Sequence, residues 1–224
     1  MSNHLLPMDP AQLESLGAMV TARSGLAWGP RGRRLLGHVA DSRVQSLALS
    51  GVSGYIAHLR RDESEWRQLL PRLTDGSTSF FRNATQFDAL SQVLLDDLTL
   101  RREERRLTLV SAGCGSGQEP FSLAIAVKES GLLNKGWQVD ILAGDIDPEA
   151  IDTARNAFYS ASDVEGVSAD RLQRWFRRRG NRWQLREEIR DMVRWSEFNL
   201  ADRESWPWAD CWGQVDAVLI RHVL

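Results

Sequence analysis

Residues 109–127 read LVSAGCGSGQEPFSLAIAV, and this stretch decides the fold. The apolar run at its start, which begins at Leu107, predicts a buried strand. Three alternating glycines follow, and then an alanine-rich helix with Pro120 in its first turn, where a missing N–H costs nothing. Because glycine has no Cβ, the backbone of such a turn can bend sharply and approach a ligand closely.

The spacing of these glycines indicates what the turn could bind. It is neither the G-x-G-x-x-G of a dinucleotide site nor a phosphate-binding loop, since no Gly-Lys-Ser/Thr follows. Glu119 stands where a pyrophosphate would have to lie, and its carboxylate would repel phosphate. A cationic amine fits better, and S-adenosylmethionine carries an ammonium and a sulfonium but no phosphate. The alternative is a glycine turn that only packs.

Residues 139–145 predict the next strand, which ends at Asp145. Asp147 and Pro148 then open a helix as its N-cap and its first residue. An acidic side chain at the end of the second strand is the usual partner of a ribose diol. Asp145 could instead be a turn residue only. Since Asp147 does the capping, we expect Asp145 to be left free for the ligand.

Four blocks of the sequence resemble one family, the chemoreceptor glutamate methyltransferases of the CheR type. The blocks are TSFFR at 78–82, SAGCGSGQEPFS at 111–122, GDIDP at 144–148 and FNL at 198–200, in the family's order. The first block and the QEPFS ending are specific to this family, whereas the glycine turn alone would not be. The similarity runs from about residue 10 to the last residue.

The resemblance implies an α/β fold. A Rossmann-like class I methyltransferase domain would occupy 107–224, with a small antiparallel β subdomain inserted at about 160–196. An all-α N-terminal domain at 1–73, and a linker with a helix over the cofactor at 74–106, would precede it. The family's sheet has three more strands and an active-site tyrosine that would fall just past Leu224. We therefore expect a domain truncated at its C-terminal end, whether naturally or by engineering.

The resemblance also implies which residues hold S-adenosylmethionine. Thr78 and Arg82 would contact its methionine end, and Arg82, the one residue we assign to catalysis, would pair with the carboxylate. Asn199 and Leu200 would contact the adenine, although Asn199 alone could equally be a turn former. The expected cofactor ligands are Gly76, Thr78, Arg82, Ala112, Gly113, Glu119, Asp145, Ile146, Asn199, Leu200, Arg221 and His222.

Two of these positions depart from the family's pattern. Members often have asparagine in place of Gly76, and usually in place of His222. The side-chain contact from position 76 is thereby lost, whereas His222 could still donate a hydrogen bond. These departures leave open a different class of function, a signalling module that binds cofactor or receptor without turnover. A methyltransferase for a small molecule is the second alternative.

The N-terminal segment is rich in arginine. Residues 10–72 predict helices, one of them from about Arg31 to Leu49, and through Leu73 nine arginines and no lysine stand against six acids. Such a face can be simply solvated. In the family, the N-terminal domain presents a basic helix to the receptor's methylation helices. The expected receptor-docking residues, predicted to lie mostly outward, are Arg31, Arg33, Arg34 and Arg43.

Gly180 and Asn181 predict a tight turn between two short strands. Family members that dock on a pentapeptide at receptor tails have a longer, glycine-containing loop here, so the chain resembles the pentapeptide-independent branch. The implied reaction transfers a methyl group to a receptor glutamate. With a reference pKa of about 4.3, this carboxylate is ionised at neutral pH and needs no strong general base. The site has to hold it in line with the sulfonium methyl and exclude water.

Composition limits the remaining possibilities. A chain of 224 residues with 42% hydrophobic residues and a net charge of −2 can build a core and has no general attraction to nucleic acid or membrane. No apolar run approaches a membrane span, and the N-terminus lacks a signal-peptide pattern. The two cysteines fit a reducing cytoplasm. The four histidines lack metal-ligand spacing, so we expect no metal.

Overall fold

The computed structural model describes residues 9–74, 76–89, 95–202, 204 and 206–221. By its internal contacts the chain divides into two units, which are described separately. One comprises Met1–Asp75, Asn199–Ser205 and Val223–Leu224, and the other comprises Gly76–Phe198 and Trp206–His222. Nothing in the sequence indicates that residues 199–205 belong with the N-terminal helices.

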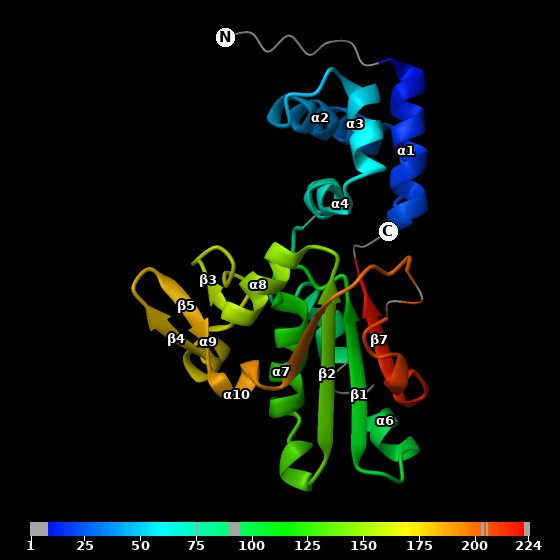
Figure 1. Cartoon of the computed structure of the whole chain (residues 1–224). Coiled ribbons are helices and arrows are strands. Elements are labelled where there is room, and N and C mark those ends of the chain that lie inside the picture. Colours follow the sequence, from blue (N-terminus) through cyan, green and yellow to red (C-terminus); the bar gives the residue numbers. More distant parts are fainter. Residues whose placement is uncertain (1–8, 75, 90–94, 203, 205, 222–224) are drawn as a thin grey trace. The chain divides into compact units, whose positions relative to one another are not determined.

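The first unit is helical (Figure 1). Its elements are α1 (Pro10–Ser24), α2 (Pro30–Ser46), α3 (Val52–Leu59), α4 (Glu63–Leu69) and the 3-10 helix η1 (Leu70–Leu73). The Asp9 carboxylate caps α1 by accepting a hydrogen bond from the N–H of Ala11, and Gly25 ends the helix with a φ of +74°. Helices over residues 10–72 are therefore confirmed, with α2 ending three residues before the predicted Leu49.

Arg43 does not lie outward on α2, so that expectation is wrong. Its Nε and Nη2 donate to the two carboxylate oxygens of Glu65 at 2.8 and 2.7 Å, and the Tyr55 hydroxyl donates to the same carboxylate at 2.8 Å. Arg43 follows the buried Val39 by one helical turn, and its side chain is only 15% exposed. Burial raises the pKa of Glu65, but the hydrogen bonds from Arg43 and Tyr55 leave it below its ordinary value.

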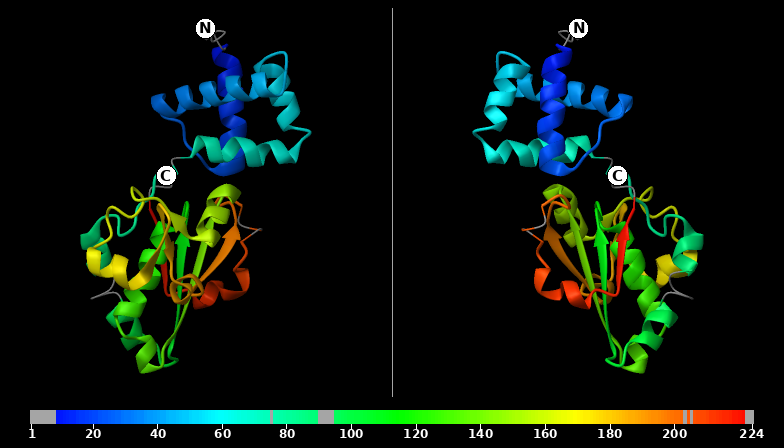
Figure 2. Two further views of the ribbon diagram at one scale, coloured as in Figure 1. Left: turned by 90° about the vertical axis from the view of Figure 1, so that its left-hand side faces the viewer. Right: turned by 90° about the vertical axis from the view of Figure 1, so that its right-hand side faces the viewer.

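The second unit contains a parallel sheet of four strands, β1 (Arg106–Ala112), β2 (Gln138–Asp145), β6 (Val193–Glu197) and β7 (Ala217–Ile220). The strand order is β6-β2-β1-β7. Helices α7 (Gln118–Glu129) and α8 (Pro148–Asn156) follow β1 and β2, and Asp147 caps α8 with Pro148 at its first position, as predicted. Figure 2 shows α7 on one face of the sheet and the 3-10 helix η4 (Ala209–Gln214) on the other. The predicted Rossmann-like α/β fold is confirmed.

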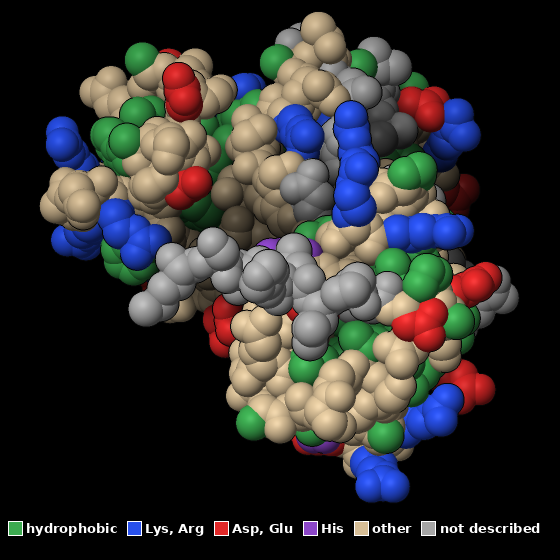
Figure 3. Space-filling view, turned by 90° about the horizontal axis from the view of Figure 1, so that it is seen from above, with side chains coloured by type: hydrophobic (Ala, Val, Ile, Leu, Met, Phe, Trp, Pro, Cys, Tyr) green, Lys and Arg blue, Asp and Glu red, His purple; other side chains and the backbone are tan. Residues whose placement is uncertain are grey.

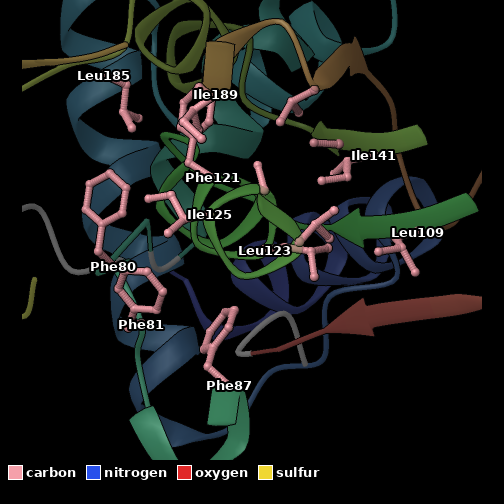
Figure 4. Close-up of a cluster of buried hydrophobic side chains, with 14 of the residues drawn as sticks. Phe80, Phe81, Phe87, Leu109, Phe121, Leu123, Ile125, Ile141, Leu185 and Ile189 are labelled. Atoms are coloured by element: carbon pink, nitrogen blue, oxygen red, sulfur yellow. The ribbon is translucent and has the colours of Figure 1, made fainter. Parts of the chain in front are cut away.

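The core of this unit is built around α7. Every residue from Gln118 to Val127 is buried, because the sheet lies on one side of the helix and other elements cover the rest. Phe121, Leu123 and Ile125 of α7 meet Phe80 of the linker in one apolar cluster (Figure 4). The linker block 78–82 is therefore part of the core of the cofactor domain and not an exposed connection.

A second, antiparallel sheet of three short strands has the order β3-β5-β4. Its strands are β3 (Phe158–Tyr159), β4 (Phe176–Arg179) and β5 (Arg182–Leu185), with α9 (Ala169–Trp175) and α10 (Glu187–Arg190) beside them in sequence. Gly180, with a φ of +62°, makes the predicted turn. The arginines of β4 and β5 are exposed, and basic side chains gather at the left of the view in Figure 3. The segment 193–196 belongs to β6 of the parallel sheet, so the small sheet ends before the expected residue 196.

The linker region holds two further helices. They are α5 (Ala84–Ala89) and α6 (Leu95–Arg101), within the range 74–106 where a linker with a helix is expected. Residues 90–94, between the two helices, lie outside the described residues. A short 3-10 helix, η3 (Leu133–Lys135), leads into β2. In the described part of the chain, no helix has both the length and the apolar character that crossing a membrane requires.

Candidate functional site

The carboxyl ends of the parallel strands bring the candidate residues together. Ala112 at the end of β1 is in register with Gly144 of β2 on one side and with Ile220 of β7 on the other. The residues that follow, which include Gly113, Asp145 and Arg221, therefore meet at one edge of the sheet. This is the edge at which parallel α/β sheets bind their ligands.

The glycine turn has the open backbone that its sequence predicts. Gly113, Gly115 and Gly117 have φ values of +71°, +53° and +94°, which side chains with a Cβ rarely adopt. The N–H groups of Gly113 and Cys114 donate to the carbonyl of Gly144 at 2.9 and 3.1 Å, so the turn is fixed to the end of β2. A Cβ on Gly117 would lie 2.8 Å from the Cβ of Ala154 in α8, which explains why glycine is needed there.

The linker lies directly on the turn. A Cβ added to Gly115 would stand 3.3 Å from Cγ2 of Thr78 and 3.8 Å from the carbonyl oxygen of Gly76. The structure therefore brings Gly76 and Thr78 next to the turn, although they precede Gly115 by 39 and 37 residues in the sequence. Gly76 is exposed and Thr78 half-buried, which leaves both accessible to a ligand at this edge.

Asp145 is not left free, contrary to the expectation from its neighbour's capping role. Its Oδ2 accepts a hydrogen bond from the N–H of Gly115 at 2.7 Å, and its Oδ1 accepts one from the N–H of Asp147 at 3.0 Å. A carboxylate has about four acceptor positions, so these bonds do not use all of them. Burial raises the pKa of Asp145, and the hydrogen bonds from Asp147 and Gly115 oppose that rise. Ile146, the next residue, is half-buried at the same edge.

Glu119 forms a buried polar cluster with two other residues. Its Oε1 accepts a hydrogen bond from the Ser111 hydroxyl at 2.8 Å, and its Oε2 pairs with Nε of Arg221 at 2.5 Å. The side chains of Glu119 and Arg221 are 8% and 19% exposed. Sequence reasoning missed Ser111, since a serine inside a strand gives no signal of its partner. The cluster fixes the carboxylate that is expected to face the cofactor's ammonium.

Arg82 joins this cluster through its backbone. Its carbonyl accepts a hydrogen bond from Nη1 of Arg221 at 2.8 Å, and its own Nη1 donates to the carbonyl of Ser77 at 2.8 Å. The guanidinium of Arg221 also lies over the ring of Phe87, with 5.0 Å between Cζ and the ring centroid. Arg221 thus ties the end of β7 to the linker and to α7.

Two expected adenine ligands fall in the helical unit, and one expected ligand is not described. The Asn199 amide donates to the carbonyl of Arg23 at 2.7 Å and accepts from the N–H of Ala201 at 3.0 Å, and Leu200 follows in the same unit. His222 lies outside the described residues. Sequence alone does not show that the α1 carbonyl at Arg23 is a partner of Asn199.

The chemistry of this edge suits a cationic ligand with a ribose and no phosphate. Among the described residues no cluster of His, Cys, Asp or Glu is placed to hold a metal ion. Burial raises the pKa of the Cys114 thiol well above its ordinary value, so this cysteine is not a ready nucleophile. An open glycine turn, an acid at the end of β2 and a buried Glu119 fit a Rossmann-like domain of the kind that binds S-adenosylmethionine.

Comparison with known proteins gives the family. The model described as "CheR methyltransferase, SAM binding domain" matches residues 76–224, more than half of the chain, and the chain belongs to this family. Its cofactor is S-adenosylmethionine, which fits the residues at the turn. The expected resemblance to the CheR-type methyltransferases is therefore confirmed.

Several relatives are similar over most of the chain. The chemotaxis protein methyltransferase of Salmonella typhimurium is 26% identical over 98% of this chain and 74% of its own length. In Pseudomonas aeruginosa, chemotaxis protein methyltransferase 1 is 27% identical over 96% of this chain and 78% of its own length. Chemotaxis protein methyltransferase 2 of the same organism is 32% identical over 81% of this chain and 64% of its own length.

Proposed function

We propose that this chain transfers a methyl group from S-adenosylmethionine to glutamate side chains of a chemoreceptor-like protein. The observation that carries the proposal is the edge of the sheet where Asp145, the glycine turn and the Glu119–Arg221 pair meet. The glutamate substrate is ionised at neutral pH and is itself the nucleophile, so the reaction needs no strong general base. The names of the relatives support methylation in chemotaxis.

For the individual residues we propose the roles that the resemblance to the family implies. Arg82 and Thr78 hold the methionine end, with the Arg82 guanidinium facing the carboxylate, and Gly76 contributes backbone only. Glu119 faces the ammonium, and Ala112 and Gly113 line the turn beneath it. Asp145 and Ile146 hold the ribose side. Arg221 acts by holding Glu119.

A transfer assay with tritium in the methyl group of the cofactor tests this function. The acceptors are cytoplasmic fragments of chemoreceptors and, in parallel, small carboxylic acids. Label on the receptor fragment alone is the expected result. Label on a small acid alone would indicate a small-molecule methyltransferase, and cofactor binding without any transfer would indicate a signalling module without turnover.

The raised pKa of Asp145 gives cofactor binding a defined pH dependence. The folded protein holds this proton to a higher pH than the unfolded chain does. The carboxyl's contribution to stability is therefore present below the unfolded pKa and lost as pH rises through the folded pKa. Binding has the opposite requirement, since ribose hydroxyls donate to an ionised carboxylate. We expect affinity for S-adenosylhomocysteine to fall as pH is lowered, starting at a higher pH than an ordinary aspartate, at about 4, would give.

Calorimetric titrations of wild type and Asp145→Asn, from roughly pH 8 down to pH 4, measure this dependence. We expect Asp145→Asn to bind S-adenosylhomocysteine more weakly at neutral pH. Its affinity should also lack the part of the pH dependence that comes from ionisation of Asp145. If the two proteins give parallel profiles, another group controls the pH dependence and Asp145 does not hold the ribose.

For the helical unit, we propose a role in docking the receptor. The side chains of Arg31, Arg33 and Arg34 on α2 are exposed, which supports them as a basic surface for an acidic partner. Arg43 is withdrawn from this set because it pairs with the buried Glu65. We propose that residues 1–73 dock the receptor, that residues 74–106 form a linker over the cofactor and that residues 107–224 carry out catalysis.

Charge reversal on α2 tests the docking surface. We expect Arg33→Glu with Arg34→Glu to slow receptor methylation about tenfold at low salt, because rim charges mainly set the rate of association. Affinity for S-adenosylhomocysteine stays unchanged. The matched control reverses Arg60 and Arg61, which are also exposed arginines of this unit. Equal rates in the two double variants would show that α2 is not the docking surface.

The tight turn at Gly180 further supports a partner of the pentapeptide-independent kind. Only two residues, Gly180 and Asn181, separate β4 from β5, so the loop between these strands is too short to bind a peptide. We also propose the cytoplasm as the compartment, since that is where chemoreceptors present their methylation helices. Receptor fragments with and without the tail peptide should be methylated at equal rates.

A further inference from the structure

Tyr159 connects the small antiparallel sheet to the cofactor turn. It lies on β3, opposite Trp183 of β5, and is 1% exposed. Its hydroxyl donates a hydrogen bond to the carbonyl of Ser116, inside the glycine turn, at 2.8 Å. The ring packs edge-on against Phe80 of the linker and Phe121 of α7, with centroid distances of 4.9 and 6.4 Å.

The hydrogen bond acts on a peptide group that is held from both sides. In the peptide group between Ser116 and Gly117, the Ser116 carbonyl accepts a hydrogen bond from Tyr159. The Gly117 N–H of the same peptide group donates to the carbonyl of Cys114 at 3.1 Å. A peptide group fixed at both its oxygen and its hydrogen cannot rotate freely. Gly117 also leaves no space for a side chain, since a Cβ there would lie 3.2 Å from the Tyr159 hydroxyl.

The other restraints on the turn come from elsewhere. The N–H groups of Gly113 and Cys114 bond to the end of β2, and the N–H of Gly115 bonds to Asp145, which also belongs to β2. In the second half of the turn, the Ser116 hydroxyl donates to the side chain of Gln118 at 2.9 Å, and the Ser116 carbonyl is held by Tyr159 and so by the small sheet. A turn with three glycines has many alternative conformations, so each restraint reduces the entropy that cofactor binding would otherwise cost.

We propose that Tyr159 is a positioning residue for cofactor binding, which holds the glycine turn in its binding conformation through the carbonyl of Ser116. The inference rests on the proposed cofactor site and adds a role for the small sheet in that site. The Tyr159 hydroxyl does not reach the reacting atoms. It acts through the turn, so its loss should weaken cofactor binding and leave the methyl-transfer step itself almost unchanged.

Tyr159→Phe tests the proposal, with Tyr55→Phe as the matched control. Both changes remove one buried phenol hydroxyl and its hydrogen bond, but Tyr55 bonds to Glu65 in the helical unit. Both variants should have a lower Tm than the wild type. Only Tyr159→Phe should raise the Kd for S-adenosylhomocysteine and the KM for S-adenosylmethionine, by roughly five- to tenfold, with kcat within about a factor of two.

The outcomes separate this inference from the proposed function. A lower Tm with an unchanged Kd in Tyr159→Phe would reduce Tyr159 to a structural residue and overturn the inference. A wild type that binds the cofactor but methylates no receptor would overturn the proposed function and leave the inference standing. A lower kcat at unchanged KM would also contradict a positioning role.

A second measurement follows Tyr159 in the protein with its wild-type sequence. Tyr55 and Tyr159 are the two tyrosines of the chain, so labelling with 3-fluorotyrosine gives two fluorine resonances. Saturation with S-adenosylhomocysteine should shift the resonance of Tyr159 and leave that of Tyr55 in place, and the spectrum of Tyr55→Phe assigns them. A Tyr159 resonance that does not respond would contradict the proposal.

Discussion

Replacing Glu119 by alanine is expected to lower the free energy of unfolding by about 3 kcal/mol and to abolish measurable cofactor binding. The change removes the carboxylate that accepts the Nε proton of Arg221 and leaves that guanidinium in a largely buried place. It also takes away the acceptor of the Ser111 hydroxyl, which is completely buried. Urea unfolding and calorimetric titration with S-adenosylhomocysteine measure the two effects.

Asp140→Ala is the control for this variant. Asp140 pairs with Arg106 at 2.9 Å and with Arg194 at 3.8 Å, but these arginine side chains are 49% and 59% exposed, so solvent screens both pairs. A pair of this kind contributes under about 1 kcal/mol, and its loss should leave cofactor affinity unchanged. If Glu119→Ala were as stable as Asp140→Ala and still bound cofactor, the buried cluster would be neither a structural link nor part of the site.

Gly144→Ala is expected to destabilise the cofactor domain by about 3 kcal/mol or more, the upper range for an overpacked core. A Cβ at Gly144 would stand 2.2 Å from ring carbons of Phe198 and 2.7 Å from the backbone oxygen of Ser196. The ring is buried against Trp206 and Trp208, with centroid distances of 5.2 Å to each, so it cannot move aside easily. Gly144 also carries the carbonyl that holds the glycine turn, so we expect cofactor binding to be lost as well.

Gly17→Ala makes the same chemical change, but here we expect stability to rise slightly or stay the same. Gly17 is buried inside α1, and a Cβ there would meet Leu36 and Trp28 at 3.6 Å, which is ordinary van der Waals contact. Alanine is favoured over glycine within a helix by roughly 0.5–1 kcal/mol. Thermal unfolding should therefore show no loss of stability for Gly17→Ala. Similar losses in both variants would mean that close contact with Phe198 is not the cause.

The sequence predicts those parts of the fold that depend on neighbouring residues. The strand, glycine turn and helix around residues 107–127, the cap at Asp147 and the turn at Gly180 all follow from local patterns, and the structure confirms them. The site residues that follow each strand can also be predicted, because parallel strands end at one edge of the sheet.

What the sequence does not predict depends on partners far along the chain. Arg43 turns inward because Glu65, on another helix, offers a carboxylate, and no local pattern contains that information. Ser111 has the same difficulty, since within a strand a serine is a poor signal until Glu119 is placed beside it. Tyr159 looks like a core aromatic residue, and its bond to Ser116 appears only when the small sheet is placed against the turn.

The most direct test of the central claim is the alkaline stability of the methyl group that the protein transfers. The labelled receptor fragment is isolated after the transfer reaction and treated with base. A methyl ester of glutamate is hydrolysed by base and releases the label as volatile methanol, and this is the result we predict. We also predict that a receptor fragment whose glutamates are replaced by alanine takes up no label. Label that remains on the receptor after base treatment would place the methyl group on nitrogen or another stable position and would contradict the account.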